Sequence, residues 1–353
     1  MSMEIIGYLE QAVTDGASDL FVVAGGPVSE KLDGHLKAIG QERLLPPKTR
    51  ELIGQIYALA ERSMDAYLER GDDDFAFAIP KLARFRVNAY RQRGSLAAVV
   101  RVVSFDIPDW QKIHIPKRIM DLAEKSHGMV LMTGTAGSGK STTQACLIDR
   151  INRNRDCHII TLEDPIEYLH RNQKSIVSQR EIAVDTTDYL SALRACLRQA
   201  PDVILLGEMR DAETIRTTIT AAETGHLIIG TLHTRGAVNA IDRIVDSFPS
   251  SQQAQIRMML SMVLQTVVSQ QMVPDKNGDM VPVFEVMHVN SAIRSMIRDN
   301  KSHQINNVIA ASGQDGMITM DQALLELYHN GMITKETVMD YADMPSVVQR
   351  QLQ

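Results

Sequence analysis

The chain has 353 residues, of which 44% are hydrophobic and 23% charged, and its formal net charge at pH 7 is -6. This composition predicts a folded protein of two domains, excludes a disordered or fibrous chain, and argues against nucleic acid as a partner, because nucleic-acid binders usually carry a basic excess. The N-terminus is acidic and no apolar run reaches eighteen residues, so we expect neither a secretory signal nor a membrane span. The three cysteines form no CxxC pair, which predicts no disulfide framework and no zinc site. Together these features predict a cytoplasmic protein.

The first hundred residues predict a small α+β domain. Its expected elements, in chain order, are a helix that ends at Gly16, a strand over 19–24, a hairpin over 29–39, a helix over 49–69 and strands over 75–79, 84–92 and 97–103. The hairpin is expected to turn at Asp33-Gly34, a common turn dipeptide. We place this domain at residues 1–104 and a proline-containing linker at 105–116.

Arginines stand within two of these strands. Arg84 and Arg86 share a strand face, and Arg101 lies among valines, where a charged side chain is costly unless it meets an anion. One interpretation is an arginine finger, a side chain that reaches a phosphate group bound in a neighbouring subunit. The other is an exposed polar face paired with the acidic run at 72–74, and the residues alone leave both open.

After the linker, short and nearly continuous apolar runs alternate with helical stretches. The runs cover 128–132, 157–162, 203–206 and 227–231. Buried parallel strands with crossover helices have this pattern. We therefore expect an α/β core over 117–275 and a mainly helical C-terminal region over 276–353, with a short hairpin around 276–279.

Residues 134–141 match the phosphate-loop pattern G-x-x-x-x-G-K-[ST]. The match follows a predicted strand and opens a predicted helix over 140–150, which is the context that the motif requires. Backbone amides and the helix N-terminus would hold phosphate oxygens, Lys140 would reach the β- and γ-phosphates, and Ser141 would bind Mg²⁺. The expected nucleotide-binding residues are Gly134, Thr135, Ala136, Gly137, Ser138, Gly139, Lys140, Ser141 and Thr142.

Acidic residues end two of the predicted strands. Glu163 and Asp164 follow one strand, and Glu208 follows another after Gly207, which stands where many phosphate-loop proteins carry a metal-binding aspartate. The carboxyl ends of parallel strands face the ligand crevice, so these carboxylates are candidates to anchor a metal ion or to orient water. The alternative for each is a carboxylate that caps the following helix.

Two histidines flank the predicted strand over 227–231. His226 precedes it and His233 follows it, so the pair could sense a γ-phosphate from the two ends of the strand. A lone histidine is more often a structural hydrogen-bonding group, and a zinc site would need a third clustered ligand.

Taken together, these motifs resemble those of the type IV pilus retraction ATPases, the PilT family of the type II/IV secretion ATPase superfamily. The resemblance covers nearly the whole chain. The segments that carry it are the phosphate loop, the aspartate box at 160–167, the atypical Walker B segment at 201–211, the histidine box at 224–234, residues 84–89, and the AIRxxIR-like segment at 292–298. The chain departs from the family pattern at Phe21, at 29–31 and at 135–136.

The resemblance implies a PAS-like N-terminal domain, a RecA-like ATPase domain and a helical C-terminal tail in a homohexamer that binds ATP and Mg²⁺. Glu163 becomes the expected general base and Glu208 a ligand of Mg²⁺ and water, while Arg86, Arg101, His226 and His233 become candidates for the catalytic site. The expected activity is ATP hydrolysis that drives pilus retraction at the inner face of the cytoplasmic membrane. The implied partners are an inner-membrane pilus platform protein and, as a further candidate, a second retraction-type ATPase.

Three other functions compete with this one. An extension or secretion ATPase of the same superfamily usually carries a paired CxxC insert and a longer N-terminal region, and this sequence has neither. A weakly hydrolysing accessory ring is disfavoured by the intact carboxylates. A DNA-translocating ring is disfavoured by the acidic balance.

Overall fold

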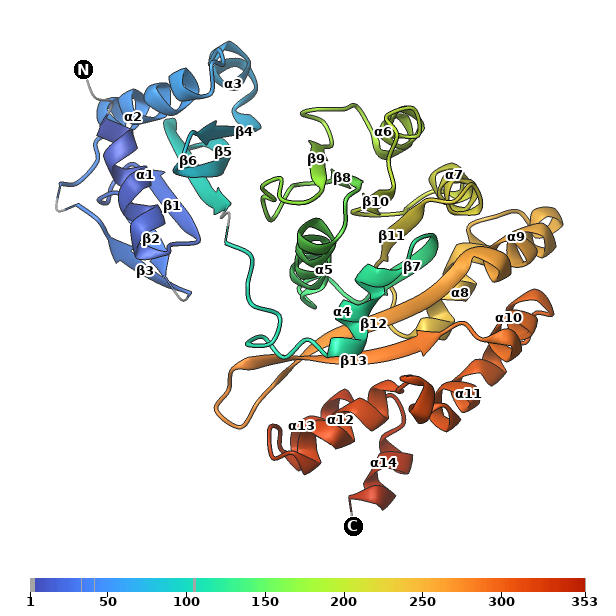
Figure 1. Ribbon diagram of the computed structural model, residues 1–353. Helices are drawn as coiled ribbons and strands as arrows, with labels where there is room; N and C mark the ends of the chain where they lie inside the picture. The colour runs from blue at the N-terminus through green and yellow to red at the C-terminus, as the bar shows by residue number, and fades with distance from the viewer. Residues whose placement is uncertain (1–3, 33, 41, 104–105, 353) are drawn as a thin grey trace. The chain divides into compact units, whose positions relative to one another are not determined.

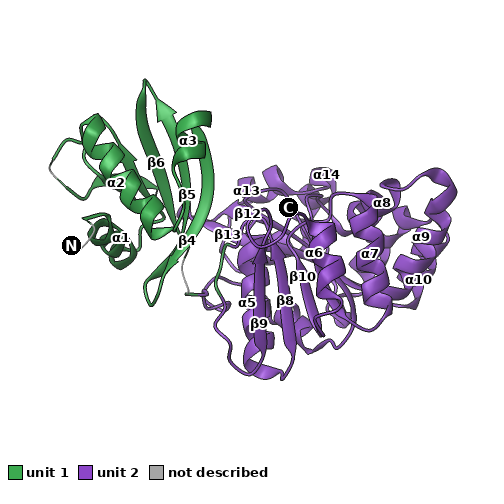
Figure 2. Cartoon of the chain, turned by 90° about the horizontal axis from the view of Figure 1, so that it is seen from above, with its two compact units in different colours: residues 1–106, 167–169 green, residues 107–166, 170–353 purple. Residues whose placement is uncertain are grey.

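The computed structural model describes residues 4–32, 34–40, 42–103 and 106–352, which form two compact units (Figure 1). The first unit covers residues 1–106 together with 167–169, and the second covers 107–166 and 170–353 (Figure 2). Two predictions fall partly outside the described residues: Asp33 is one of the two residues of the expected hairpin turn, and residue 105 is the first of the expected linker.

The first unit is an antiparallel sheet with helices packed on one of its faces. The sheet has the order β3-β2-β1-β6-β5-β4. Its elements are α1 (Glu4–Asp15), β1 (Asp19–Val23), β2 (Ser29–Leu32), β3 (His35–Ala38), α2 (Pro46–Leu59), α3 (Asp65–Arg70), β4 (Asp72–Ile79), β5 (Ala83–Gln92) and β6 (Ser95–Val103). The expectation of one helix over 49–69 is wrong, because Glu61 adopts φ 51°, a left-handed conformation that a continuing helix does not accommodate.

The two faces of β5 differ as its alternating sequence predicts. Phe85, Val87 and Ala89 are fully buried in the core of the first unit. Arg84 and Arg86, which alternate with them, are half-buried on the other face of the sheet.

The second unit is built on a seven-stranded sheet of order β13-β12-β7-β11-β10-β8-β9. Its strands are β7 (Gly128–Thr133), β8 (His158–Glu163), β9 (Ile176–Glu181), β10 (Val203–Leu206), β11 (Leu227–Leu232), β12 (Leu264–Pro274) and β13 (Met280–His288). All neighbouring pairs are parallel except β12 and β13. The four strands predicted from apolar runs are confirmed, and β9 is an addition that its mostly polar sequence did not indicate.

Helices cover both faces of this sheet, because its strands alternate between two hydrophobic cores. Met129, Leu131, Ile204 and Leu206 pack with one set of helices, and the residues between them pack with the other. The first set is α6 (Tyr189–Cys196), α7 (Ala212–Glu223), α8 (Ala237–Asp246), α9 (Ser250–Val263), α10 (Ser291–Arg298) and α11 (Ile305–Ala311). The second set is α4 (Lys117–Met120), α5 (Lys140–Asn154), α12 (Met320–His329), α13 (Lys335–Tyr341) and α14 (Pro345–Gln351). Short 3₁₀ turns lie at Asp121–Glu124, Ser302–Gln304 and Gly313–Asp315.

The hairpin expected around 276–279 is confirmed, but it is much longer than predicted. Its strands β12 and β13, drawn in orange in Figure 1, pair over residues 266–288. Because β12 also pairs with β7, the hairpin extends the central sheet. The region over 276–353 is therefore mainly helical only after β13 has ended.

Buried Glu285 joins this hairpin to two helices. Its carboxylate accepts hydrogen bonds from the backbone N–H of Ala237 at 2.6 Å and from that of Met320 at 3.4 Å. These are the first residues of α8 and α12. The buried carboxylate therefore caps one helix of the ATPase core and one helix of the C-terminal region.

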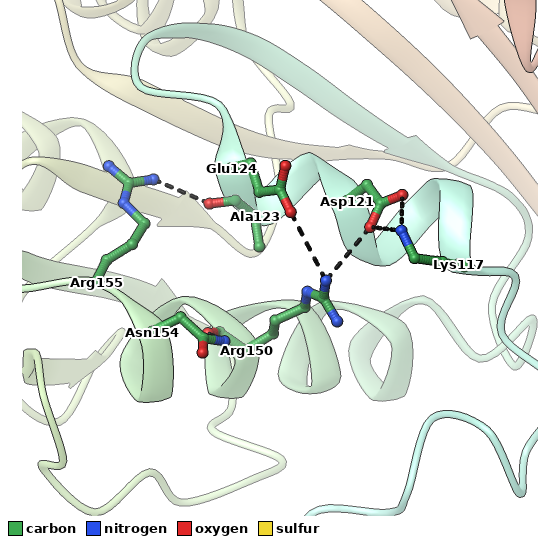
Figure 3. A network of polar contacts seen from close by, with 7 residues as sticks. All are labelled: Lys117, Asp121, Ala123, Glu124, Arg150, Asn154 and Arg155. Atoms are coloured by element: carbon green, nitrogen blue, oxygen red, sulfur yellow. Dashed lines mark hydrogen bonds and ion pairs between the residues drawn. The ribbon is translucent and has the colours of Figure 1, made fainter.

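Ion pairs hold the second half of α5 against the turn that precedes β7 (Figure 3). Arg150 of α5 lies 3.3 Å from Asp121 and 3.8 Å from Glu124, and Lys117 lies 2.7 Å from Asp121. Just beyond the helix, Arg155 donates to the carbonyl of Ala123 at 3.2 Å. The helix that carries the phosphate-binding motif is thus anchored at the end away from the motif.

Candidate active site

Four parallel strands of the second unit end at one edge of the sheet. Glu163 is the last residue of β8, and the loops after β7, β10 and β11 carry the phosphate loop, Glu208 and His233 respectively. The register aligns the ends of these strands, since Thr133 pairs with Leu232 and Leu206 pairs with Leu162. The topology thus brings these four predicted groups to one edge.

The phosphate loop runs from β7 into α5 and folds around the side chain of Lys140. The Lys140 ammonium donates to the carbonyl oxygens of Gly134 at 2.8 Å and Thr135 at 2.7 Å, and to the Ser138 hydroxyl at 3.4 Å. Burial lowers the pKa of Lys140, and the negative charge of Glu208 acts in the opposite direction. Ser141, in the first turn of α5, is exposed.

Gly134 must be glycine because the backbone of β12 passes against it. Its φ is 144°, and a Cβ atom at this position would stand 2.2 Å from the carbonyl oxygen of Gln270. The Gln270 side chain accepts a hydrogen bond from the Thr143 hydroxyl of α5 at 2.9 Å. Gln270 therefore supports both ends of the phosphate loop, a role that the sequence did not indicate.

We expect Gly134→Ala to lower the melting temperature by roughly 5 °C and to weaken nucleotide binding, because the new methyl group displaces either the loop or β12. Differential scanning fluorimetry with and without ADP measures both effects. Gly225→Ala is the matched control, because φ is also positive there (104°) while nothing lies within 4 Å of the added atom. Equal melting temperatures for the two variants would contradict the steric argument.

A second contact ties α5 to β11. Gln144 of α5 donates to the Thr231 hydroxyl at 2.7 Å, and both residues are buried. Thr231 precedes His233 by two residues, so this hydrogen bond joins α5 to the end of the strand that leads into the histidine.

Glu208 lies between Arg210 and His233. Its carboxylate is 2.6 Å from Arg210 Nη2 and 3.6 Å from His233 Nε2, and the side chain is 17% exposed. Burial raises the pKa of Glu208, but Arg210 and then His233 outweigh it, so the net pKa lies below the usual value. The carboxylate is thus held ionised near Lys140.

Glu163 and Glu208 are brought together by the close approach of their backbones. Gly207 N–H donates to the carbonyl of Leu162 at 2.8 Å, and a Cβ atom on Gly207 would lie 3.3 Å from Glu163 Cα. A side chain at position 207 would separate the two strand ends, which explains why glycine stands in place of the aspartate found in many phosphate-loop proteins.

One oxygen of Glu163 is held by two donors. Oε1 accepts from the Thr161 hydroxyl at 2.7 Å and from the Gln179 amide at 3.2 Å. Tyr189 lies beside the same group: burial raises the pKa of its phenol, and the charges of Asp164, Glu208 and Glu163 raise it further. The phenol therefore remains a protonated donor among three carboxylates.

The structure removes the helix-capping alternative for these carboxylates. The element that follows Glu163 and Asp164 is the strand β9. The cap of α7, which follows Glu208, is Asp211, whose side chain accepts from Thr214 N–H at 2.8 Å. Glu208 is therefore not required for local helix stability.

The structure does not bring His226 into this site. His226 precedes β11, and its carbonyl accepts from the N–H of Gly128 at the start of β7, whereas the phosphate loop follows the end of β7. A strand of six residues, roughly 20 Å long, separates it from His233. Its ring bonds to the carbonyl of Ala221 at 2.9 Å, which is a structural role at the end of α7.

The arginines of the first unit lie on neighbouring strands, with Arg86 directly opposite Arg101. Arg101 lies on the exposed face of its strand, as one of the two interpretations has it, since its side chain is 58% exposed and pairs with Asp19 at 3.0 Å. Within the acidic run, Asp73 binds Arg62 at 2.8 Å, and the partner of Arg101 is Asp19 instead. Two arginines side by side repel each other, and a bound anion would relieve this repulsion.

The oxygen atoms at this edge suit Mg²⁺. Ser141 offers a hydroxyl and Glu208 an ionised carboxylate, which are the hard donors that Mg²⁺ prefers. Across the described residues there is no cluster of three or more His, Cys, Asp or Glu side chains that could hold a metal ion. Such a composition fits an ion held by one or two protein oxygens together with substrate phosphates.

The AIRxxIR-like segment forms α10 and divides between core and surface. Ile293 and Ile297 are fully buried, while Arg298 is exposed and Arg294 donates to the carbonyl of Met262 at 3.2 Å. Among the described residues, no helix is long and apolar enough to cross a membrane.

Comparison with known proteins identifies relatives over nearly the whole chain. Residues 3–340 match the family model described as type II/IV secretion system protein. The type IV pilus retraction ATPase PilT of Pseudomonas aeruginosa is 40% identical over 343 residues, covering 97% of this chain and 99% of the relative. A twitching motility protein of Neisseria gonorrhoeae is 43% identical over 295 residues, covering 83% of this chain and 79% of the relative.

A crystal structure described as the pilus retraction motor PilT with bound ADP has a TM-score of 0.89 to this structure, with 43% sequence identity and 99% of each chain covered. The agreement confirms the predicted fold class, an α/β chain in which an N-terminal domain precedes a RecA-like ATPase domain with helices at its C-terminal end.

Proposed function

Since this chain belongs to the type II/IV secretion system protein family, we propose that it hydrolyses ATP and that this hydrolysis drives the retraction of type IV pili. The observation that carries the proposal is the meeting of Lys140, Glu163 and Glu208 at one edge of the sheet. A phosphate-binding loop beside two ionisable carboxylates supports phosphoryl transfer to water.

Each group has a distinct part in the reaction. The amides of residues 134–142 and the Lys140 ammonium hold the β- and γ-phosphates, and Glu163 accepts a proton from the attacking water. Ser141 and Glu208 are the residues that would hold Mg²⁺, which would supply positive charge next to the phosphate oxygens. His233 lies 3.6 Å from Glu208, so its contact with that carboxylate would change whenever the carboxylate binds a different group.

We further propose that the chain works as a homohexamer in the cytoplasm, at the inner face of the membrane. The relatives named for retraction and twitching motility support a pilus machine as the larger partner. An inner-membrane pilus platform protein is the proposed docking partner, and a second retraction-type ATPase is a further one. The polar surface of α10, with Arg294 and Arg298, is available for such contacts.

Phosphate release from ATP in the presence of Mg²⁺ tests the catalytic proposal, with Glu208→Gln as the reference. No release by the wild-type chain above that reference would favour the accessory ring over the motor. Added duplex DNA is expected to leave the rate unchanged, and a strong stimulation by DNA would favour a translocating ring instead.

Retraction and extension are separated in cells. Fluorescently labelled pili are expected to extend but not to retract when the gene is deleted, and a plasmid copy should restore retraction. Cells that lose pili altogether would favour an extension or secretion ATPase.

We propose that Arg101, beside Arg86, acts on ATP held by a neighbouring subunit. Arg101→Ala should then lower turnover by about 10³-fold, the scale of a lost arginine finger, while the affinity for a fluorescent ADP analogue stays within about twofold. Arg93→Ala, in the exposed turn after β5, is the control. Normal turnover by the Arg101 variant would remove Arg101 from the catalytic site.

A further inference from the structure

The edge strand β9 carries a glutamine whose amide is fixed at both ends. Gln179 Nε2 donates to Glu163 Oε1 at 3.2 Å, and Gln179 Oε1 accepts from the backbone N–H of His170 at 2.8 Å. The register places Gln179 opposite Thr161 and Glu181 opposite Glu163, so the four side chains share one face of the sheet.

The backbone decides which way this amide points. An N–H group can only donate, so the His170 amide requires the oxygen of the Gln179 side chain. The NH₂ group must then face Glu163. The orientation of the side chain is therefore dictated by the loop after β8, and a free rotation of the amide would break two hydrogen bonds.

Side chains on this face of β9 also bind the loop that follows β8. Glu181 accepts from the N–H of Ile166 at 3.3 Å, while Gln179 accepts from the N–H of His170. Two neighbouring side chains of β9 thus hold the loop that runs on from Glu163. The ring of His170 is largely buried, and this burial lowers its pKa to about 4, so the ring stays neutral.

We propose that Gln179 is a positioning residue for the general base. Together with Thr161 it holds Glu163 Oε1, so that the rotation of the carboxylate is set and its other oxygen is directed at the attacking water. This inference rests on the proposed ATP hydrolysis and on the role of Glu163 in it. A general base must lie within hydrogen-bond reach of the proton that it removes, so a freely rotating carboxylate is less effective.

Two substitutions separate this role from that of a loop fastener. Gln179→Glu keeps an acceptor for the N–H of His170 but replaces the donor with a like charge against Glu163. Gln179→Leu removes both hydrogen bonds. We expect both variants to lose kcat by about 10- to 100-fold, with the affinity for a fluorescent ADP analogue within about twofold of wild type, because the base and not the phosphate loop is disturbed.

The experiment measures phosphate release against ATP concentration, nucleotide affinity and melting temperature for wild type, both variants and Gln173→Leu. Gln173 is an exposed glutamine in the same loop, and its variant should match wild type in all three. A Gln179→Glu variant with wild-type kcat would overturn the proposal and leave Gln179 as a loop fastener. Equal losses in kcat and in nucleotide affinity would also overturn it. Absence of phosphate release by the wild-type chain would instead refute the proposed function, and the positioning role with it.

Discussion

Lys140→Ala will abolish ATP hydrolysis, with turnover lowered by about 10³-fold or more, because it removes the cation that meets the charge developing on the γ-phosphate. The ammonium is already placed by the loop, since the carbonyls of Gly134 and Thr135 hold it at 2.8 and 2.7 Å. Nucleotide affinity should fall as well, by about 10- to 100-fold, the scale of one charged hydrogen bond. Phosphate release and titration with a fluorescent ADP analogue measure the two effects.

Lys174→Ala is the control for this substitution. Lys174 also donates to a backbone carbonyl, that of Asn154 at 3.0 Å, but it is exposed and lies away from the phosphate loop. Its variant should hydrolyse ATP at the wild-type rate. A Lys140 variant that retained half of the wild-type turnover, with an unchanged melting temperature, would show that nucleotide is processed elsewhere.

Glu163→Gln should bind nucleotide like the wild-type chain yet lose turnover by about 10²- to 10⁴-fold, the range attributed to a general base. The substitution keeps the shape of the side chain and removes its capacity to accept a proton from water. Binding is expected to survive because Glu163 ends β8, whereas the phosphate loop follows β7 and is supported by α5 and β12. Single-turnover phosphate release, with affinity measured in parallel, tests both statements.

Glu167→Gln offers a matched control for the general base, since Glu167 is an exposed carboxylate four residues further along. Its variant should turn over ATP normally. If Glu163→Gln kept wild-type turnover while Glu208→Gln did not, the proton acceptor would have to be sought at Glu208 or in water, and the role given to Gln179 would lapse.

The parts of the site that could be predicted are those whose geometry is local. The phosphate loop needs a strand, glycines and a helix start within one short segment, and Gly134 and Lys140 lie as that pattern requires. Glu163 and Glu208 could be placed because each ends an apolar strand, and parallel strands end at a common edge. In both cases the sequence around a residue was sufficient to locate it.

The supporting residues could not be predicted because their partners are distant in sequence. Gln270 meets Thr143 of the phosphate-loop helix and the backbone of Gly134, and its strand contains buried polar side chains that mask the usual strand pattern. Gln179 lies on β9, whose mostly polar sequence gave no apolar signal. From the sequence alone, a buried polar side chain that hydrogen-bonds to a distant segment cannot be distinguished from a polar side chain exposed to solvent.

The carboxylate of Glu285 makes the C-terminal helices part of the ATPase core. One of its oxygens binds the first amide of α8, the helix that follows His233, and the other binds the first amide of α12. Deleting the chain from α12 onward would therefore remove one of the two backbone hydrogen bonds to buried Glu285. The packing of α8, the helix that follows His233, would become less rigid. A shortened chain intended to lack only a docking element would be altered in the way it handles nucleotide, so loss of function in it would not locate the docking surface.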